Sequence, residues 1–207
     1  MNIIDSLHGG YIYKRRVATL RDALAAVMPQ NARILDVGCG DGLVAHLIHE
    51  NRPDVTVEGI DIMLRPKRYV PIVEFDGRVI PHPDASFDVV MFVDVLHHTD
   101  DPTVLLREAC RVASKAVVIK DHTRDGFLAG PTLKFMDWVG NARHGVVLPY
   151  NYWPKKKWMS AFGELGMAIE EWERDVGLYP WPLSWMFGRS LHFVARLNPR
   201  ASLQPKK

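Results

Sequence analysis

The sequence predicts an α/β fold in which a doubly wound, mostly parallel sheet lies between two layers of helices. Short apolar segments bounded by turn residues alternate along the chain with segments of helical periodicity. Gly38, Gly40 and Gly42 follow the first apolar segment, and Asp61 ends the second. Such alternation gives parallel strands joined by helices, with ligands bound at the carboxyl ends of the strands.

Periodicity places each element. Apolar positions at helical spacing predict helices, and short, nearly continuous apolar runs predict buried parallel strands. In chain order, strands are expected at about 33–37, 55–60, 72–75, 87–93, 116–119, 167–172 and 191–196. Helices are expected at about 13–28, 42–51, 101–112, 127–140 and 155–165.

Prolines and glycines set the ends of these helices. Pro29 and Pro53 stop the first two, and Pro154 precedes the last, which Gly166 ends. The segment 64–71 contains two prolines, so at most a turn or two fits between the second and third strands.

Bulk properties predict a single globular domain over residues 1–198, opened by an N-terminal helical segment, 1–30. Residues 121–166 break the alternation and are interpreted as an insertion. The polar residues 199–207 are expected to form a flexible tail.

Charge and cysteine usage limit the function classes. The net charge of +2 argues against a nucleic-acid partner, and the two cysteines, Cys39 and Cys110, have no metal-site spacing and form no disulfide framework. The residues carry no signal-peptide pattern and no apolar run of ~18 residues. We therefore expect a cytoplasmic protein with no metal site.

The glycine spacing narrows the choice of ligand. Glycines let the backbone approach a ligand closely, and the next helix offers free N–H groups. A dinucleotide fingerprint needs a third glycine where Leu43 stands, which disfavours a nicotinamide cofactor. Asp61 follows Gly42 by 19 residues, where its carboxylate can accept hydrogen bonds from ribose hydroxyls.

The run from Ile34 to Gly42, Ile-Leu-Asp-Val-Gly-Cys-Gly-Asp-Gly, resembles the first motif of class I S-adenosylmethionine (SAM) methyltransferases. Segments 75–77, 80–90 and 93–98 are similar to later family motifs and follow in the same order. The resemblance covers residues 15–120 well and the rest in outline, and it points to the small, single-domain, type 11-like members.

The resemblance implies a three-layer, Rossmann-like fold with seven strands, an antiparallel last strand and an edge hairpin made by the last two strands. It implies SAM as cofactor and S-adenosylhomocysteine as product. The implied cofactor-binding residues are Asp36, Gly38, Cys39, Gly40, Asp61, Ile62, Asp76, Gly77, Val93 and Asp94.

By the same resemblance, each part of the cofactor has its residues. Asp36 and the first two glycines face the methionine part. Asp61 binds the ribose, Ile62 packs on the adenine, and Asp76 accepts the adenine amino group. Val93 and Asp94 lie under the sulfonium.

Plainer interpretations of these residues stay open. Asp61 could cap a turn, and Asp76 with Gly77 could form a tight turn. Asp94 could be structural, and Cys39 could be no more than a small residue that fits.

Methyl transfer from a sulfonium mainly requires alignment, exclusion of water and, for some acceptors, a base. His98 after strand four and His122 after strand five are the candidate catalytic residues, because imidazole titrates near neutral pH. The alternative is that these rings pack against the core. Some acceptors would need no base.

All six tryptophans follow residue 137, and two aromatic clusters stand out, 150–158 and 178–187. An exposed loop this apolar is unusual, so we expect it to cover a hydrophobic substrate, a partner subunit or a membrane surface. Our hypothesis is that the substrate-side insertion 121–166 and the loop 177–188 form a lid. Ordinary packing over the sheet is the alternative.

The leading hypothesis is SAM-dependent methylation of a small, hydrophobic or aromatic acceptor. Two alternatives are a weakly active or inactive SAM-binding module that acts through a partner, and an NAD(P)-dependent oxidoreductase. The sequence leaves open the acceptor, the methylated atom and the oligomeric state.

Overall fold

A computed structural model describes residues 3–141, 149–181, 183–188 and 191–200 of the chain. Within them, one seven-stranded sheet has the order β3-β2-β1-β4-β5-β7-β6. The strands are β1 (Arg33–Val37), β2 (Thr56–Asp61), β3 (Ile72–Glu74), β4 (Phe87–Val93), β5 (Ala113–His122), β6 (Ala168–Glu173) and β7 (His192–Asn198). Strands β1 to β5 pair in parallel, whereas β7 is antiparallel to β5 and β6 is antiparallel to β7.

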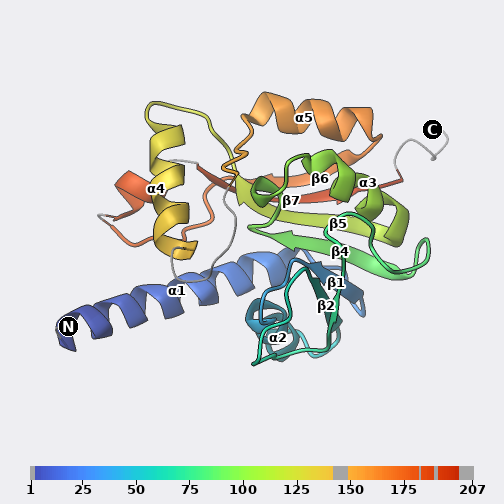
Figure 1. The fold of residues 1–207 in the computed structure, drawn as a ribbon, viewed down its shortest axis with the longest axis horizontal. Coiled ribbons are helices and arrows are strands. Elements are labelled where there is room, and N and C mark those ends of the chain that lie inside the picture. The colour runs from blue at the N-terminus through green and yellow to red at the C-terminus, as the bar shows by residue number, and fades with distance from the viewer. Residues whose placement is uncertain (1–2, 142–148, 182, 189–190, 201–207) are drawn as a thin grey trace.

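Helices cover both faces of the sheet, which confirms the predicted three-layer fold class. The helices are α1 (Ile3–Val27), α2 (Leu43–Asn51), α3 (Pro102–Val112), α4 (Ala129–Asn141) and α5 (Lys155–Glu164), with the short turns η1 (Leu96–His98) and η2 (Ser184–Gly188). Figure 1 shows α3 and α5 on one face and α1 and α2 on the other. Helix α4 stands apart, beyond the carboxyl end of β5 (Figure 1).

The two faces of the sheet bury two separate apolar cores. Alternate strand side chains point to opposite faces, so Leu35 packs with α3 and α5 while its neighbour Ile34 packs with α1 and α2. On the first face, Leu106 of α3 and Phe162 of α5 are at most 1% exposed. On the second face, Leu24 of α1 is fully buried. The central strands are covered on both sides, which explains their continuous apolar sequence.

Two elements differ clearly from their predicted bounds, α1 and β5. Helix α1 begins at Ile3, not at residue 13, although Gly9 and Gly10 lower the helix propensity of this segment. Strand β5 runs to His122 and so includes the first two residues of the predicted insertion. As predicted, residues 62–71 between β2 and β3 form no helix.

The strand prediction for β5 was too short because the end of the strand is polar. Lys120, Asp121 and His122 interrupt the apolar run, yet all three are buried. Burial of such groups requires partners inside the protein, which periodicity alone does not reveal.

Of the predicted flexible tail, residues 201–207 lie outside the described residues. Among the helices that are described, none combines the length and the apolar character that a membrane span needs.

The assigned core predicts that substitutions inside it and on the surface change the free energy of unfolding by different amounts. Leu35→Ala removes a fully buried side chain, so we expect a loss of about 2–5 kcal/mol in the free energy of unfolding. Val73→Ala, at a position 55% exposed on the edge strand, should change it by less than about 0.5 kcal/mol. Urea denaturation measures both, and similar losses would contradict the assigned core.

Candidate active site

A cavity of about 740 Å³ opens at the carboxyl ends of β1, β2 and β4. This volume is in the range of pockets for cofactors and small ligands. Its wall consists of Gly38, Gly40, Asp61, Ile62, Met63, Arg65, Phe75, Asp76, Gly77, Arg78, Asp94, Val95, His98, Thr99, Asp100, Asp101, Val104, Leu105 and Pro149. Seven of the ten predicted cofactor-binding residues are therefore brought to one cavity.

The glycine-rich turn between β1 and α2 forms one end of the cavity. Gly38 has φ of +74°, and a Cβ there would lie 2.6 Å from the side chain of Val95, so this position has no room for a side chain. Gly40 has φ of +62°, and the atom nearest to a Cβ there would be 3.9 Å away, on Arg65. The Gly40 backbone is thus openly accessible from the cavity.

Asp61 ends β2 and holds this turn in place. Its Oδ2 accepts the N–H of Gly40 at 2.8 Å, and its Oδ1 accepts the N–H of Met63 at 3.0 Å. The carboxylate therefore fixes both its own turn and the glycine turn. Next to it, the side chain of Ile62 is 63% exposed at the cavity.

The tight turn considered for Asp76 and Gly77 is present. Oδ1 of Asp76 accepts the N–H groups of Arg78 and Val79, both at 2.8 Å, and Gly77 has φ of +76°. These two hydrogen bonds lower the pKa of the Asp76 carboxyl. Both residues also line the cavity, so the turn does not preclude a binding role.

The other three predicted cofactor residues do not line the cavity. Val93 packs against the core beneath α1 and α2, and Cys39 turns toward Gly59 of β2. Burial raises the pKa of the Cys39 thiol, so it is unreactive. Asp36 is 2% exposed, and its Oδ1 has no hydrogen-bond partner among the described residues. Burial, and then the nearby Asp61, raise the pKa of Asp36 to about 7.

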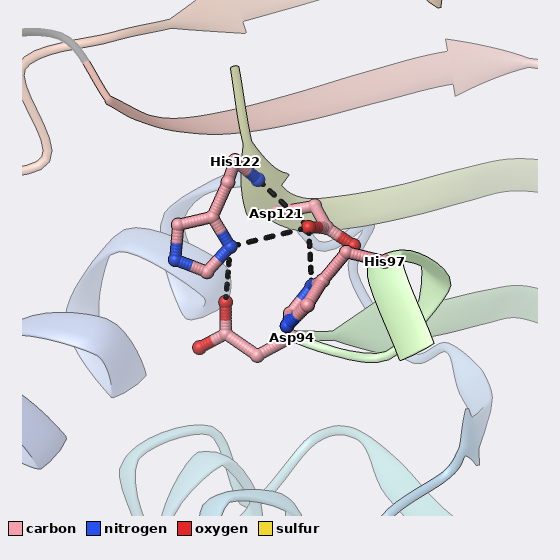
Figure 2. Close-up of side chains that lie close together, drawn as sticks. All are labelled: Asp94, His97, Asp121 and His122. Carbon is pink, nitrogen blue, oxygen red and sulfur yellow. Dashed lines mark hydrogen bonds and ion pairs between the residues drawn. The ribbon is translucent and has the colours of Figure 1, made fainter. Parts of the chain in front are cut away.

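A network of charged side chains lies at the ends of β4 and β5 (Figure 2). Asp94 follows β4 with φ of +56°, an unusual backbone conformation for a residue other than glycine. Its carboxylate pairs with the fully buried Lys120 and lies 3.8 Å from Arg16 of α1. Burial opposes ionisation of Asp94, but these cations, Lys120 first, hold its pKa below the usual value.

His97 and Asp121 form the second pair of this network. Nδ1 of His97 lies 2.7 Å from Oδ1 of Asp121, and both side chains are at most 2% exposed. Burial alone would lower the pKa of His97, yet Asp121 outweighs it and raises the pKa to about 10. The pair is therefore an imidazolium and a carboxylate at neutral pH.

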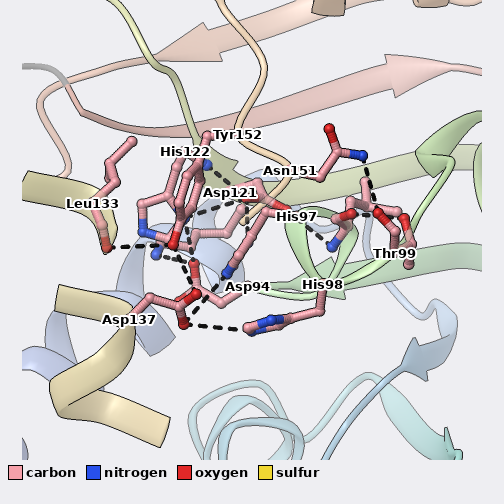
Figure 3. A network of polar contacts seen from close by, with 12 residues as sticks. Asp94, His97, His98, Thr99, Asp121, His122, Leu133, Asp137, Asn151 and Tyr152 are labelled. Carbon is pink, nitrogen blue, oxygen red and sulfur yellow. Dashed lines mark hydrogen bonds and ion pairs between the residues drawn. The ribbon is translucent and has the colours of Figure 1, made fainter. Parts of the chain in front are cut away.

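Helix α4 contributes a third carboxylate (Figure 3). Oδ1 of Asp137 lies 3.9 Å from Nε2 of His97 and 3.7 Å from Nε2 of His98. Its Oδ2 accepts the Tyr152 hydroxyl at 2.8 Å. Asn151, the residue before Tyr152, donates its backbone N–H to His97 at 3.1 Å, so α4 and this segment are both fixed to η1.

Among the described residues, the carboxylates of this network and its cations are equal in number. The anions are Asp94, Asp121 and Asp137, and the cations are Arg16, Lys120 and His97. A balanced set tolerates burial because every charge has a close counterion.

The two other histidines near this network, His98 and His122, are neutral. Burial, and then His97, lower the pKa of His98. Burial, and then Lys120, lower the pKa of His122 to about 4.

The two predicted catalytic histidines have different places. His98 lines the cavity, and its ring centroid is 4.1 Å from that of His97. His122 is 8% exposed and does not line the cavity; its Nδ1 lies 3.3 Å from Asp121 and 3.5 Å from Asp94. His122 therefore packs inside the protein, whereas His98 lies where it can contact a ligand in the cavity.

The predicted lid contributes little to this cavity. From the insertion 121–166 only Pro149 is in its described wall. Residues of the loop 177–188 line a second cavity of about 300 Å³, beside His192.

Sequence reasoning missed Arg16, Lys120, Asp137 and Tyr152. A signal existed for Lys120, which interrupts an apolar strand. None existed for Asp137, because its role depends on where α4 docks.

Comparison with known proteins shows the family of this chain. Residues 10–171 match the family described as a methyltransferase domain. The chain therefore belongs to this family, and SAM is the cofactor that the family assigns to it, with S-adenosylhomocysteine as the product. The sequence motifs predicted the family as well as the cofactor.

Two curated relatives and one solved structure illustrate the likeness. The 27-O-demethylrifamycin SV methyltransferase of Amycolatopsis mediterranei (strain S699) is 35% identical over 129 residues, 52% of this chain and 47% of that protein. The 2-methyl-6-phytyl-1,4-hydroquinone methyltransferase of Synechocystis sp. (strain ATCC 27184 / PCC 6803 / Kazusa) is 27% identical over 137 residues, 62% of this chain and 38% of that protein. Each match thus spans less than half of the relative's length.

An S-adenosylmethionine-dependent methyltransferase from Mesorhizobium loti has the same fold. The TM-score is 0.64 at 21% identity, over 86% of this chain and 96% of that one.

The His97–Asp121 pair predicts a pH dependence of stability. The pKa of His97 is about 10 in the folded protein against 6.5 for an ordinary histidine. Its stabilisation is therefore complete below about pH 6.5 and is lost as the pH rises toward 10. Between these values the free energy of unfolding should fall more steeply in the wild type than in His97→Gln/Asp121→Asn, which lacks the pair. Urea denaturation across this range measures both slopes; equal slopes would contradict the charged pair.

Proposed function

We propose that the chain transfers the methyl group of SAM to a hydroxyl-bearing, apolar or aromatic small molecule. The observation that supports this most is the position of His98. A neutral imidazole faces the same cavity as the glycine turn and Asp61. A cofactor-binding end and a proton acceptor thus share one space of suitable size.

The residues present fit the cofactor. The accessible backbone at Gly40 leaves room for the methionine part. Each carboxylate oxygen of Asp61 accepts one backbone N–H in the structure, which leaves lone pairs for two ribose hydroxyls. Ile62 offers an exposed apolar side chain for the adenine face, and Oδ2 of Asp76 is the oxygen that the turn's two hydrogen bonds do not use.

The buried Asp36 is also compatible with bound SAM. Its unpartnered Oδ1 lies beneath the glycine turn, where an ammonium group nearby would favour the ionised carboxylate. The side chain does not reach the cavity wall, so we propose an electrostatic role for it and no direct contact.

When bound, SAM supplies a methyl group that is already activated by a positively charged sulfonium. The protein then has to align the acceptor and remove a proton from it. His98 takes the proton at a ring nitrogen, and the Asp137 carboxylate 3.7 Å away stabilises the imidazolium that forms. His97 already holds its own proton and is unable to accept another.

Two observations support the acceptor class. Phe75, Val95, Val104, Leu105 and Pro149 give part of the cavity an apolar wall. One relative is named for a phytyl hydroquinone and another for a demethylated rifamycin. The apolar class of the acceptor, a cytoplasmic location and the absence of a nucleic-acid partner stay predictions.

Asp61→Asn should weaken SAM binding by about tenfold or more, because charge-assisted hydrogen bonds contribute roughly 1.5–3 kcal/mol. Titration calorimetry measures the dissociation constants for SAM and S-adenosylhomocysteine, with NADP⁺ as the comparison ligand. Glu74→Gln, an exposed neighbour on β3, is the control and should bind like the wild type. Binding of NADP⁺ in place of SAM would support the oxidoreductase alternative.

His98→Gln should lower kcat by about a hundredfold or more while the dissociation constant of SAM stays the same. The assay is transfer of a labelled methyl group to a panel of phenols and hydroquinones. His49→Gln, at the C-terminal end of helix α2 and outside the described cavity wall, is the control. Normal SAM binding without methylation of any acceptor would favour the inactive binding module.

A further inference from the structure

Helix α4 exposes three large apolar side chains and buries its only carboxylate. Leu133 and Asp137 face inward and are 1% and 9% exposed. Phe135, Trp138 and Val139 face outward and are 54%, 57% and 58% exposed. A surface helix of a globular protein normally has the opposite arrangement, so the outward face of α4 suits an apolar environment.

The apolar surface extends beyond α4. Phe127, just before the helix, is 85% exposed, and Trp181 and Trp185 of the loop 177–188 are 84% and 75% exposed. Leu191, which follows η2, packs in one cluster with Leu133 of α4. In Figure 1 the colour bar identifies the short η2, which lies beside α4. The segments that carry these aromatic residues therefore lie at one end of the molecule. We call this surface the aromatic end.

Around the aromatic end, exposed cations outnumber exposed acids. Asp175 is exposed, whereas Asp125 is half-buried and accepts the backbone N–H of Lys155. Residues 176–188 contain no charged residue, and the single acid of α4 is the buried Asp137. Arg124 and Lys134 are exposed beside the aromatic residues. On α1, Lys14 and Arg15 are exposed next to Arg16, whose guanidinium lies 5.6 Å from the ring centre of Tyr179 in the loop.

We propose that the aromatic end is a docking surface for an anionic lipid bilayer. Protruding Trp and Phe side chains partition into the interfacial region, and lysine and arginine side chains around them pair with anionic headgroups. A second copy of the chain fits less well, because a twofold contact of this surface with itself would bring like charges together.

Docking in this way places the active site at the lipid surface. Asp137 on the inner side of α4 approaches His98 at 3.7 Å, so the helix that contacts the bilayer also forms part of the site. An apolar acceptor dissolved in the bilayer would then reach the cavity without crossing bulk water. This consequence depends on the proposed function, whereas the docking surface itself does not.

The test is flotation of the full chain with vesicles. Vesicles of phosphatidylcholine with 30% phosphatidylglycerol should bind the wild type, and pure phosphatidylcholine vesicles should bind it at least tenfold more weakly. Phe135→Gln/Trp138→Gln and Trp181→Gln/Trp185→Gln should each reduce partitioning at least tenfold. Val73→Gln/Val79→Gln, which changes two residues 55% and 59% exposed elsewhere on the surface, should bind like the wild type.

Brominated lipids give a second readout, because they quench tryptophans that enter the bilayer. Quenching should disappear when Trp138, Trp181 and Trp185 are all replaced by Gln. Of the other three tryptophans, Trp153 and Trp158 are buried, and the half-buried Trp172 stacks on Phe193 of β7. Circular dichroism and SAM titration verify that each variant is folded, and loss of SAM binding alone would count against the proposed function only.

Equal binding of the wild type and the aromatic-end variants would overturn the docking surface. So would absence of binding to anionic vesicles. A dimer in sedimentation that Phe135→Gln/Trp138→Gln dissolves would identify a second copy as the true occupant.

Discussion

The ion pairs buried at the ends of β4 and β5 are the constraint on which the site depends. Lys120 is fully buried and needs Asp94, and Asp121 is fully buried and needs His97. Removal of one partner would leave a charge without compensation in a medium of low polarity. The two pairs therefore fix the turn after β4, including the strained backbone of Asp94 and the position of η1.

From this fixed turn the rest of the site follows. Because His97 faces inward to Asp121, its neighbour His98 on the same short turn faces the cavity. The protonated His97 attracts Asp137, which holds α4 at the carboxyl ends of the strands. At the other end of the cavity, Asp61 fixes the glycine turn by the N–H of Gly40. Two carboxylate-centred arrangements thus define the two ends of one binding space.

Local patterns allowed much of the fold to be predicted. Strand β4 has the predicted bounds because a central parallel strand is continuously apolar. The prolines between β2 and β3 exclude a helix there whatever surrounds them. Gly38, Gly40 and Asp61 were correctly predicted to lie at one cavity, because the glycine spacing and a carboxylate at the end of an apolar segment can both be read from neighbouring residues. Strand β5 was cut short because its last residues are polar and depend on distant partners.

The sequence by itself thus determined the order of the elements, the methyltransferase family and the glycine turn with Asp61 at one end of the cavity, since each follows from residues close together in the chain. The tertiary structure alone decided that His98, and not His122, faces the cavity, and that Asp137 enters the site from α4. It also decided that Phe135 and Trp138 face outward. These features arise from contacts between segments far apart in the sequence. Such contacts form only when the chain folds, and the burial and pKa shifts of the residues depend on them.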